Sequence, residues 1–134
     1  MATSIVSYLG DLRTEATHLA SGSQLLTDAP VDNHGKGAAF SPTDLFATSL
    51  GSCALTIMGI AANTHHIDLT GARAEVTKIM ATTPPRRVAR IEIAFHFAKA
   101  YSEKEKSILQ HAAETCPVAL SVQTEITQNF YWKL

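Results

Sequence analysis

Residues 40–53, FSPTDLFATSLGSC, decide how this chain folds, because they hold a helix start and the first turns of an apolar helix. Ser41 fits the N-cap and Pro42 the first helical position. Asp44 stands three residues after the cap, where its carboxylate can accept the backbone N–H of Ser41. The pattern predicts a helix to about Asn63. Apolar and small residues lie all round it, which is typical of a buried central helix.

The segments on both sides of this helix alternate as strands do, with turn-like residues between them. The predicted elements are strands at residues 3–9, 12–19 and 24–27, a polar loop at 28–39, the helix, strands at 69–81 and 87–98, helices at 102–115 and 117–121, and a strand at 123–132. The first three strands predict a meander and the next two a long antiparallel pair. The order βββ-α-ββ-α-α-β predicts an α+β fold with antiparallel sheets wrapped around a buried central helix.

The composition limits the class of protein. A length of 134 residues favours a single domain, 1–134, and 46% apolar residues with a net charge of −1 argue against disorder. The balance of 11 basic against 12 acidic residues argues against nucleic-acid binding. No uninterrupted apolar run approaches 18 residues, and the first residues lack the features of a secretory signal. We therefore expect a soluble, cytoplasmic domain with no membrane span.

Two cysteines, Cys53 and Cys116, are the strong nucleophiles of the chain, and they lie 63 residues apart. This gap is too long for a CxxC motif or a zinc knuckle, and a reducing cytoplasm disfavours a permanent disulfide. Two interpretations stay open: small buried hydrophobes, or a thiol pair that meets in the fold. Local electrostatics favours Cys116 as the thiolate, because it precedes Pro117 at a helix start. Cys53 lies in the fourth turn of its helix and needs a cation from elsewhere.

Residues 40–53 resemble the helix that carries the peroxidatic cysteine in the OsmC/Ohr family of organic hydroperoxide reductases. Cys116-Pro117-Val118 resembles the second-cysteine motif of that family, and the 63-residue gap and the element order also fit. The resemblance therefore covers essentially the whole chain. It implies an OsmC-like fold, an intertwined homodimer and a cysteine-based peroxidase that acts on organic or lipid hydroperoxides.

The resemblance also implies roles for individual residues. Cys53 would attack the peroxide as a thiolate and become a sulfenic acid, which Cys116 would resolve as a disulfide. A dithiol reductant, dihydrolipoamide in the best-known branch, would restore both thiols. Arg13 would activate Cys53 of the partner subunit, because a guanidinium stays charged where water is scarce. No cofactor and no metal are implied.

One position departs from the family pattern. Thr43 stands where the organic hydroperoxide reductases have a glutamate that pairs with the arginine. Asp44 is a candidate catalytic acid, but one helical residue turns a side chain by about 100°, and Asp44 also fits the helix cap.

Other classes of function stay open. None of the six histidines are spaced i, i+4, which argues against a metal site. A thiol-dependent hydrolase or transferase needs a general base near Cys53, and the sequence places no histidine there. The non-enzymatic alternative is a catalytically weak OsmC-like protein that binds an apolar or acyl ligand.

Overall fold

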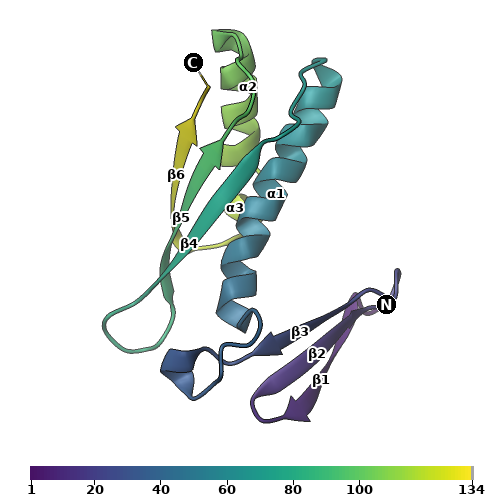
Figure 1. Ribbon diagram of the computed structural model, residues 1–134, viewed down its shortest axis with the longest axis vertical. Helices are drawn as coiled ribbons and strands as arrows, with labels where there is room; N and C mark the ends of the chain where they lie inside the picture. Colours follow the sequence, from purple (N-terminus) through teal and green to yellow (C-terminus); the bar gives the residue numbers. More distant parts are fainter. Residues whose placement is uncertain (134) are drawn as a thin grey trace. The chain divides into compact units, whose positions relative to one another are not determined.

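The computed structural model describes residues 1–133, and its elements follow the predicted order (Figure 1). They are β1 (Ser4–Gly10), β2 (Arg13–His18), β3 (Gln24–Asp28), the 3₁₀ turn η1 (Val31–Asn33), α1 (Pro42–Thr64), β4 (Arg73–Met80), β5 (Val88–His96), α2 (Glu103–Glu114), α3 (Pro117–Ser121) and β6 (Glu125–Tyr131). The chain divides into two compact units, an N-terminal unit Met1–Leu45 and a C-terminal unit that begins at Phe46. A single domain spanning residues 1–134 stays a prediction.

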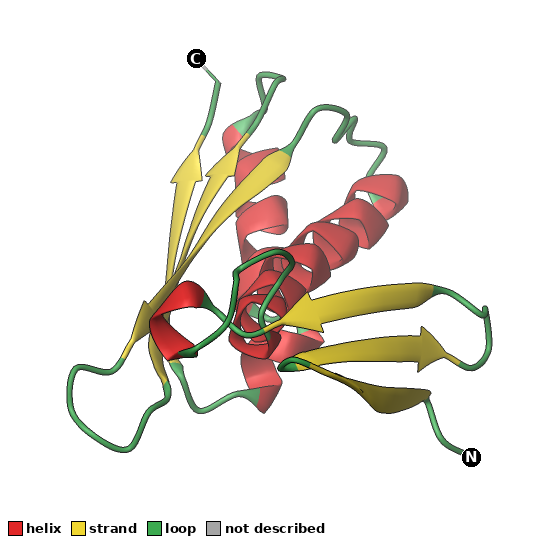
Figure 2. Cartoon of the chain, turned by 60° about the horizontal axis from the view of Figure 1, so that its bottom comes forward, coloured by secondary structure: helices red, strands yellow, loops and turns green. Residues whose placement is uncertain are grey.

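The N-terminal unit contains an antiparallel sheet in the order β1-β2-β3, the predicted meander (Figure 2). After β3 the chain forms a tight loop that leads to the start of α1. Gly35 is required in this loop, because a Cβ atom there would overlap the carbonyl group of Ala29. Backbone hydrogen bonds from Gly37 to Ala29 and from Asp28 to Phe40 close the loop.

The C-terminal unit contains a second sheet, in the order β4-β5-β6. The pair β4–β5 is antiparallel as predicted, but β6 runs parallel to β5, which differs from the expectation of antiparallel sheets. The physical reason is the connection: α2 and α3 carry the chain back along the sheet, and such a crossover returns the next strand in the same direction.

The core of the C-terminal unit lies between this sheet and the helices, which cover one of its faces (Figure 2). Alternate residues of β5 point into it, as the sequence pattern predicted. The buried residues of α1 and α2 follow helical spacing. They are Ala47, Leu50, Gly51, Ala54, Met58 and Ala62 on α1 and Leu109, Ala112 and Ala113 on α2.

Burial of α1 differs from the expectation of a helix surrounded on all sides. One stripe of α1 is buried within this chain, whereas Phe46 and Ile60 on its other faces are 37% and 58% exposed. By length and composition the helix could also cross a membrane, since it has 23 residues and an 18-residue stretch of it has a mean hydropathy of 1.7, but core helices pass the same test. Its buried stripe identifies it as the core helix of the C-terminal unit.

Candidate thiol site

Cys53 lies in the middle of α1, where it is half-buried and packs against the core. Gly51, half a turn earlier, lets the helix approach the sheet closely. A Cβ atom at Gly51 would lie 2.7 Å from Val76 Cγ2 on β4, well inside ordinary contact. The lack of a side chain at Gly51 therefore sets how close to the sheet α1 carries Cys53.

Cys116 occupies the corner between α2 and α3, as the sequence predicted. It is the N-cap of α3, with extended backbone, and Pro117 follows it at the start of the helix. Its side chain is 0% exposed. Its backbone N–H donates to the Ala113 carbonyl at 3.5 Å, and its own carbonyl accepts the N–H of Leu120 at 3.1 Å. These bonds attach the corner to both helices.

The structure brings the two thiols, both of them free, close enough to interact. Burial raises the pKa of Cys116, and the neighbouring Cys53 thiol raises it further. The amides of Ala119 and Val118 act in the opposite direction, although neither forms a capping hydrogen bond of ordinary geometry with the sulfur. The pKa of Cys116 is therefore raised, whereas a helix start alone would lower it, because burial outweighs the helix start.

Arg13 belongs to the N-terminal unit and stands at the start of β2, directly opposite Asp28 on β3. Its Nη2 lies 3.7 Å from Asp28 Oδ2; the arginine side chain is 44% exposed and the aspartate 1%. The same Oδ2 accepts the backbone N–H of Ala38 at 3.0 Å. Arg13 therefore has a buried carboxylate partner that the sequence analysis missed, because it placed Asp28 in the loop rather than at the end of the strand.

Asp44, also in the N-terminal unit, caps α1 as predicted. The N–H of Ser41 donates to Asp44 Oδ2 at 3.0 Å, and the N–H of Asp44 donates to Ser41 Oγ at 3.1 Å. The hydroxyl of Thr43 lies 3.2 Å from Ser41 Oγ. The capping role of Asp44 is thus confirmed, and its catalytic role stays a prediction.

Gln128 on β6 is a further polar residue, linked to the backbone of Cys116 through Ala113, that the sequence analysis missed. Its Nε2 donates to the Ala113 carbonyl at 3.5 Å, the carbonyl that also accepts the N–H of Cys116. The signal was available in the alternation of the last strand. An amide stands at an inward position between Ile126 and Phe130, where the pattern calls for an apolar residue.

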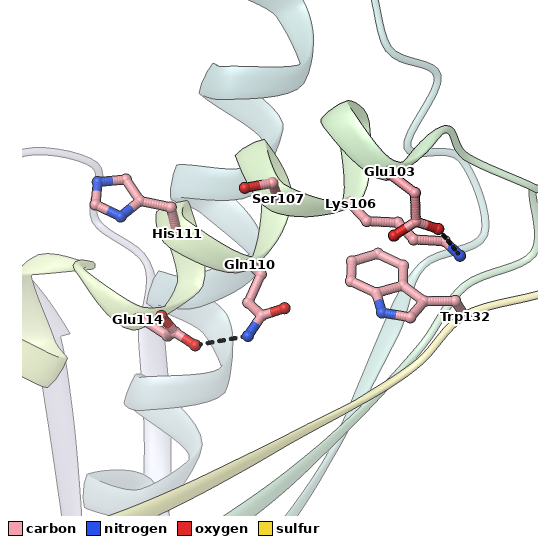
Figure 3. A pocket seen from close by; sticks show the side chains of 7 residues that line it. All are labelled: Glu103, Lys106, Ser107, Gln110, His111, Glu114 and Trp132. Carbon is pink, nitrogen blue, oxygen red and sulfur yellow. Dashed lines mark hydrogen bonds and ion pairs between the residues drawn. The ribbon is translucent and has the colours of Figure 1, made fainter.

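Two surface hollows lie elsewhere on the C-terminal unit. One, of about 420 Å³, lies beside α2 and is lined by polar side chains and Trp132 (Figure 3). There Lys106 pairs with Glu103 at 3.3 Å, and Gln110 donates to Glu114 at 3.0 Å. The other, of about 460 Å³, follows the second half of α1. Neither hollow is lined by a cysteine, so the thiol pair remains the candidate reactive group.

The two three-stranded sheets, the long core helix and the adjoining thiols define an α+β protein with a cysteine pair in its C-terminal unit. The chain belongs to the OsmC-like protein family, whose model matches residues 34–130. This confirms the family and the fold that the sequence motifs predicted.

Solved structures agree with this assignment. A protein of Psychrobacter arcticus named for osmotic-stress induction and detoxification is 53% identical, with a TM-score of 0.92 over 99% of this chain and 96% of that one. An organic hydroperoxide resistance protein OsmC of Legionella pneumophila is 18% identical, with a TM-score of 0.74 over 100% of this chain and 98% of that one.

A third structure is that of a Vibrio cholerae protein named for organic hydroperoxide resistance, with captopril bound in one of its active sites. It is 18% identical, with a TM-score of 0.71 over 97% of this chain and 90% of that one. The Legionella and Vibrio structures show a shared fold. No curated protein matches this chain.

Proposed function

We propose that this protein is a cysteine-based peroxidase that reduces organic or lipid hydroperoxides. The observation that carries the proposal is the interaction between a half-buried thiol, Cys53, and a buried thiol, Cys116, whose pKa is raised. Cys116 is fully buried whereas Cys53 is half-buried, so Cys53 is the sulfur that a substrate can reach from solvent.

The reaction has three balanced steps. The Cys53 thiolate attacks the O–O bond and takes an OH group, and the alkoxide that leaves is protonated to the alcohol. Cys116 then attacks the sulfenic acid: the S–S bond forms, and the Cys116 proton leaves with the hydroxide as water. A dithiol reductant, of the dihydrolipoamide class that the family resemblance implies, finally reduces the disulfide.

We assign Arg13 the role of the activating cation, serving Cys53 of the partner subunit in a homodimer. Its guanidinium is tied to buried Asp28 on one side and remains 44% exposed, so it has donors left for a thiolate and for the departing oxygen. A reducing cytoplasm is the compartment that we propose, because both thiols must be restored after each turnover.

Thiol titration before and after one equivalent of cumene hydroperoxide tests the proposal. Wild type should lose two thiols, Cys53→Ser should react slowly or not at all, and Cys116→Ser should lose one thiol and become reactive towards dimedone. Unchanged thiols in wild type would refute the peroxidase function and favour the ligand-binding alternative.

A matched pair of variants tests Arg13. Arg13→Met should slow the loss of the first thiol about a hundredfold. Arg73→Met is the control, because Arg73 also begins a strand and pairs with an acid, Glu75, at 3.3 Å. Equal rates for the two variants would remove Arg13 from the mechanism.

A further inference from the structure

Gln128 stands at a position where the fold calls for an apolar side chain. It lies opposite Ile93 in the parallel pairing of β5 and β6, and Ile93 is buried in the core. Its neighbours on the same face of β6, Ile126 and Phe130, pack against that core. A polar amide on this otherwise apolar face of β6 therefore needs an explanation.

The contacts of Gln128 lead to the thiol site. Its Nε2 donates to the carbonyl of Ala113, in the last turn of α2, at 3.5 Å. The same carbonyl accepts the backbone N–H of Cys116 at 3.5 Å. Ala113 and Cys116 are both fully buried. The side chain of Gln128, on the sheet, and the backbone of Cys116 are therefore hydrogen-bonded to the same carbonyl.

The amide of Gln128 stabilises the folded state less than an apolar side chain would. Its Oε1 is buried and has no hydrogen-bond partner among the described residues. A buried acceptor without a partner destabilises the folded state, whereas an apolar side chain of similar size carries no such penalty. The residue therefore contributes something other than stability.

We propose that Gln128 is a positioning residue, which fixes the α2–α3 corner so that Cys116 can form a disulfide with Cys53. The inference rests on the proposed function and names the residue that serves its second step. In that step the S–S bond forms at about 2.05 Å and its dihedral angle is restricted. The Cys116 sulfur moves while its backbone stays anchored through Ala113, and small misplacements of reacting atoms slow such steps strongly.

The test compares Gln128→Met with Asn129→Met. Methionine keeps the length of glutamine and removes the amide. Asn129 is the next residue of β6 and is exposed, so it controls for the same substitution on the opposite face. Quenched samples analysed by intact mass follow the first modification of Cys53 and the closure of the disulfide as separate steps. Thermal unfolding of each variant is measured in parallel.

Two oxidants separate this inference from the proposed function. Cumene hydroperoxide requires peroxidase chemistry, whereas diamide adds to one thiol and is displaced by the second, becoming a hydrazine as the disulfide forms. If wild type closes its disulfide with diamide and not with the hydroperoxide, the proposed function fails. The rate of disulfide closure with diamide in Gln128→Met still tests the role of Gln128.

We expect Gln128→Met to unfold no earlier than wild type, to complete the first step within about twofold of the wild-type rate, and to close the disulfide about tenfold more slowly with each effective oxidant. Asn129→Met should match wild type throughout. Three results would overturn the inference: closure at the wild-type rate, earlier unfolding of Gln128→Met, or no closure in wild type with diamide.

Discussion

Gly51→Ala adds one methyl group at a close contact between α1 and the sheet. The new Cβ would lie 2.7 Å from Val76 Cγ2 and 3.7 Å from Ala74 Cβ. The second distance is an ordinary contact, and the first requires movement. Val76 is β-branched and lies in a strand, so its χ1 angle is restricted and Cγ2 cannot easily turn away. The helix or the strand must shift.

The free energy of unfolding gives the size of the effect. Alanine in place of glycine inside a helix contributes about 0.5–1 kcal/mol. Overpacking a core costs about 1–3 kcal/mol. We therefore expect Gly51→Ala to lose about 1–2 kcal/mol, or about 4–8 °C in the unfolding midpoint of a chain of this length.

Thermal and urea unfolding measure this loss, and Gly59 supplies the matched control. It lies in the same helix, and a Cβ atom there meets nothing within 4 Å. Gly59→Ala should therefore gain about 0.5–1 kcal/mol. Gly51→Ala should become stabilising in a Val76→Ala background, where Cγ2 is absent. A Gly51→Ala variant as stable as Gly59→Ala would refute the close-approach argument.

Three other changes can be measured on the same protein. Asp44→Ala removes the carboxylate that accepts the N–H of Ser41 and should lower the free energy of unfolding by about 1 kcal/mol, whereas Asp44→Asn keeps an acceptor and should lower it less. If Asp44→Asn reacts with peroxide as fast as wild type, Asp44 caps the helix and has no catalytic role. Hydrogen bonds from Thr70 and the charge of Lys99 lower the pKa of Asp68 to about 2, so the stability that the charged carboxylate contributes is present above the ordinary pKa of 3.8 and is lost as pH falls towards 2. NMR titration of Asp68 should find a pKa of about 2, and Lys99→Met should raise that pKa. Burial raises the pKa of Cys116, so at high pH the folded state retains a proton that the unfolded chain releases. The free energy of unfolding, measured with urea, should therefore fall as pH rises past about 9. An equally steep fall in Cys116→Ala would contradict this account.

Local signals predicted most of the fold. The capping residues Ser41 and Asp44 located the start of α1 to within a residue, and the alternation in residues 87–98 identified the strand now seen at Val88–His96. The direction of β6 could not be predicted in this way. Alternation of inward and outward residues is the same whether a strand runs parallel or antiparallel to its neighbour, so the direction depends on the path of the connection.

The candidate site was less accessible to the sequence. The motifs identified Cys53 and Cys116 through a family resemblance, whereas the state of Cys116 depends on burial, which only the folded chain defines. The partnership of Arg13 with Asp28 depends on strand register. Register joins residues far apart in the sequence, and no local pattern of residues 24–28 revealed it.

The parallel pairing of β6 with β5 has a consequence for the order of folding. The strands of the N-terminal unit pair with their neighbours along the chain, so their contacts are local, whereas Arg90 pairs with Glu125 across the segment that contains α2 and α3. Non-local pairings form slowly, because the intervening chain must be ordered first. We expect β6 to join the sheet late in folding, so Gln128 reaches the carbonyl of Ala113 beside Cys116 only in the last steps.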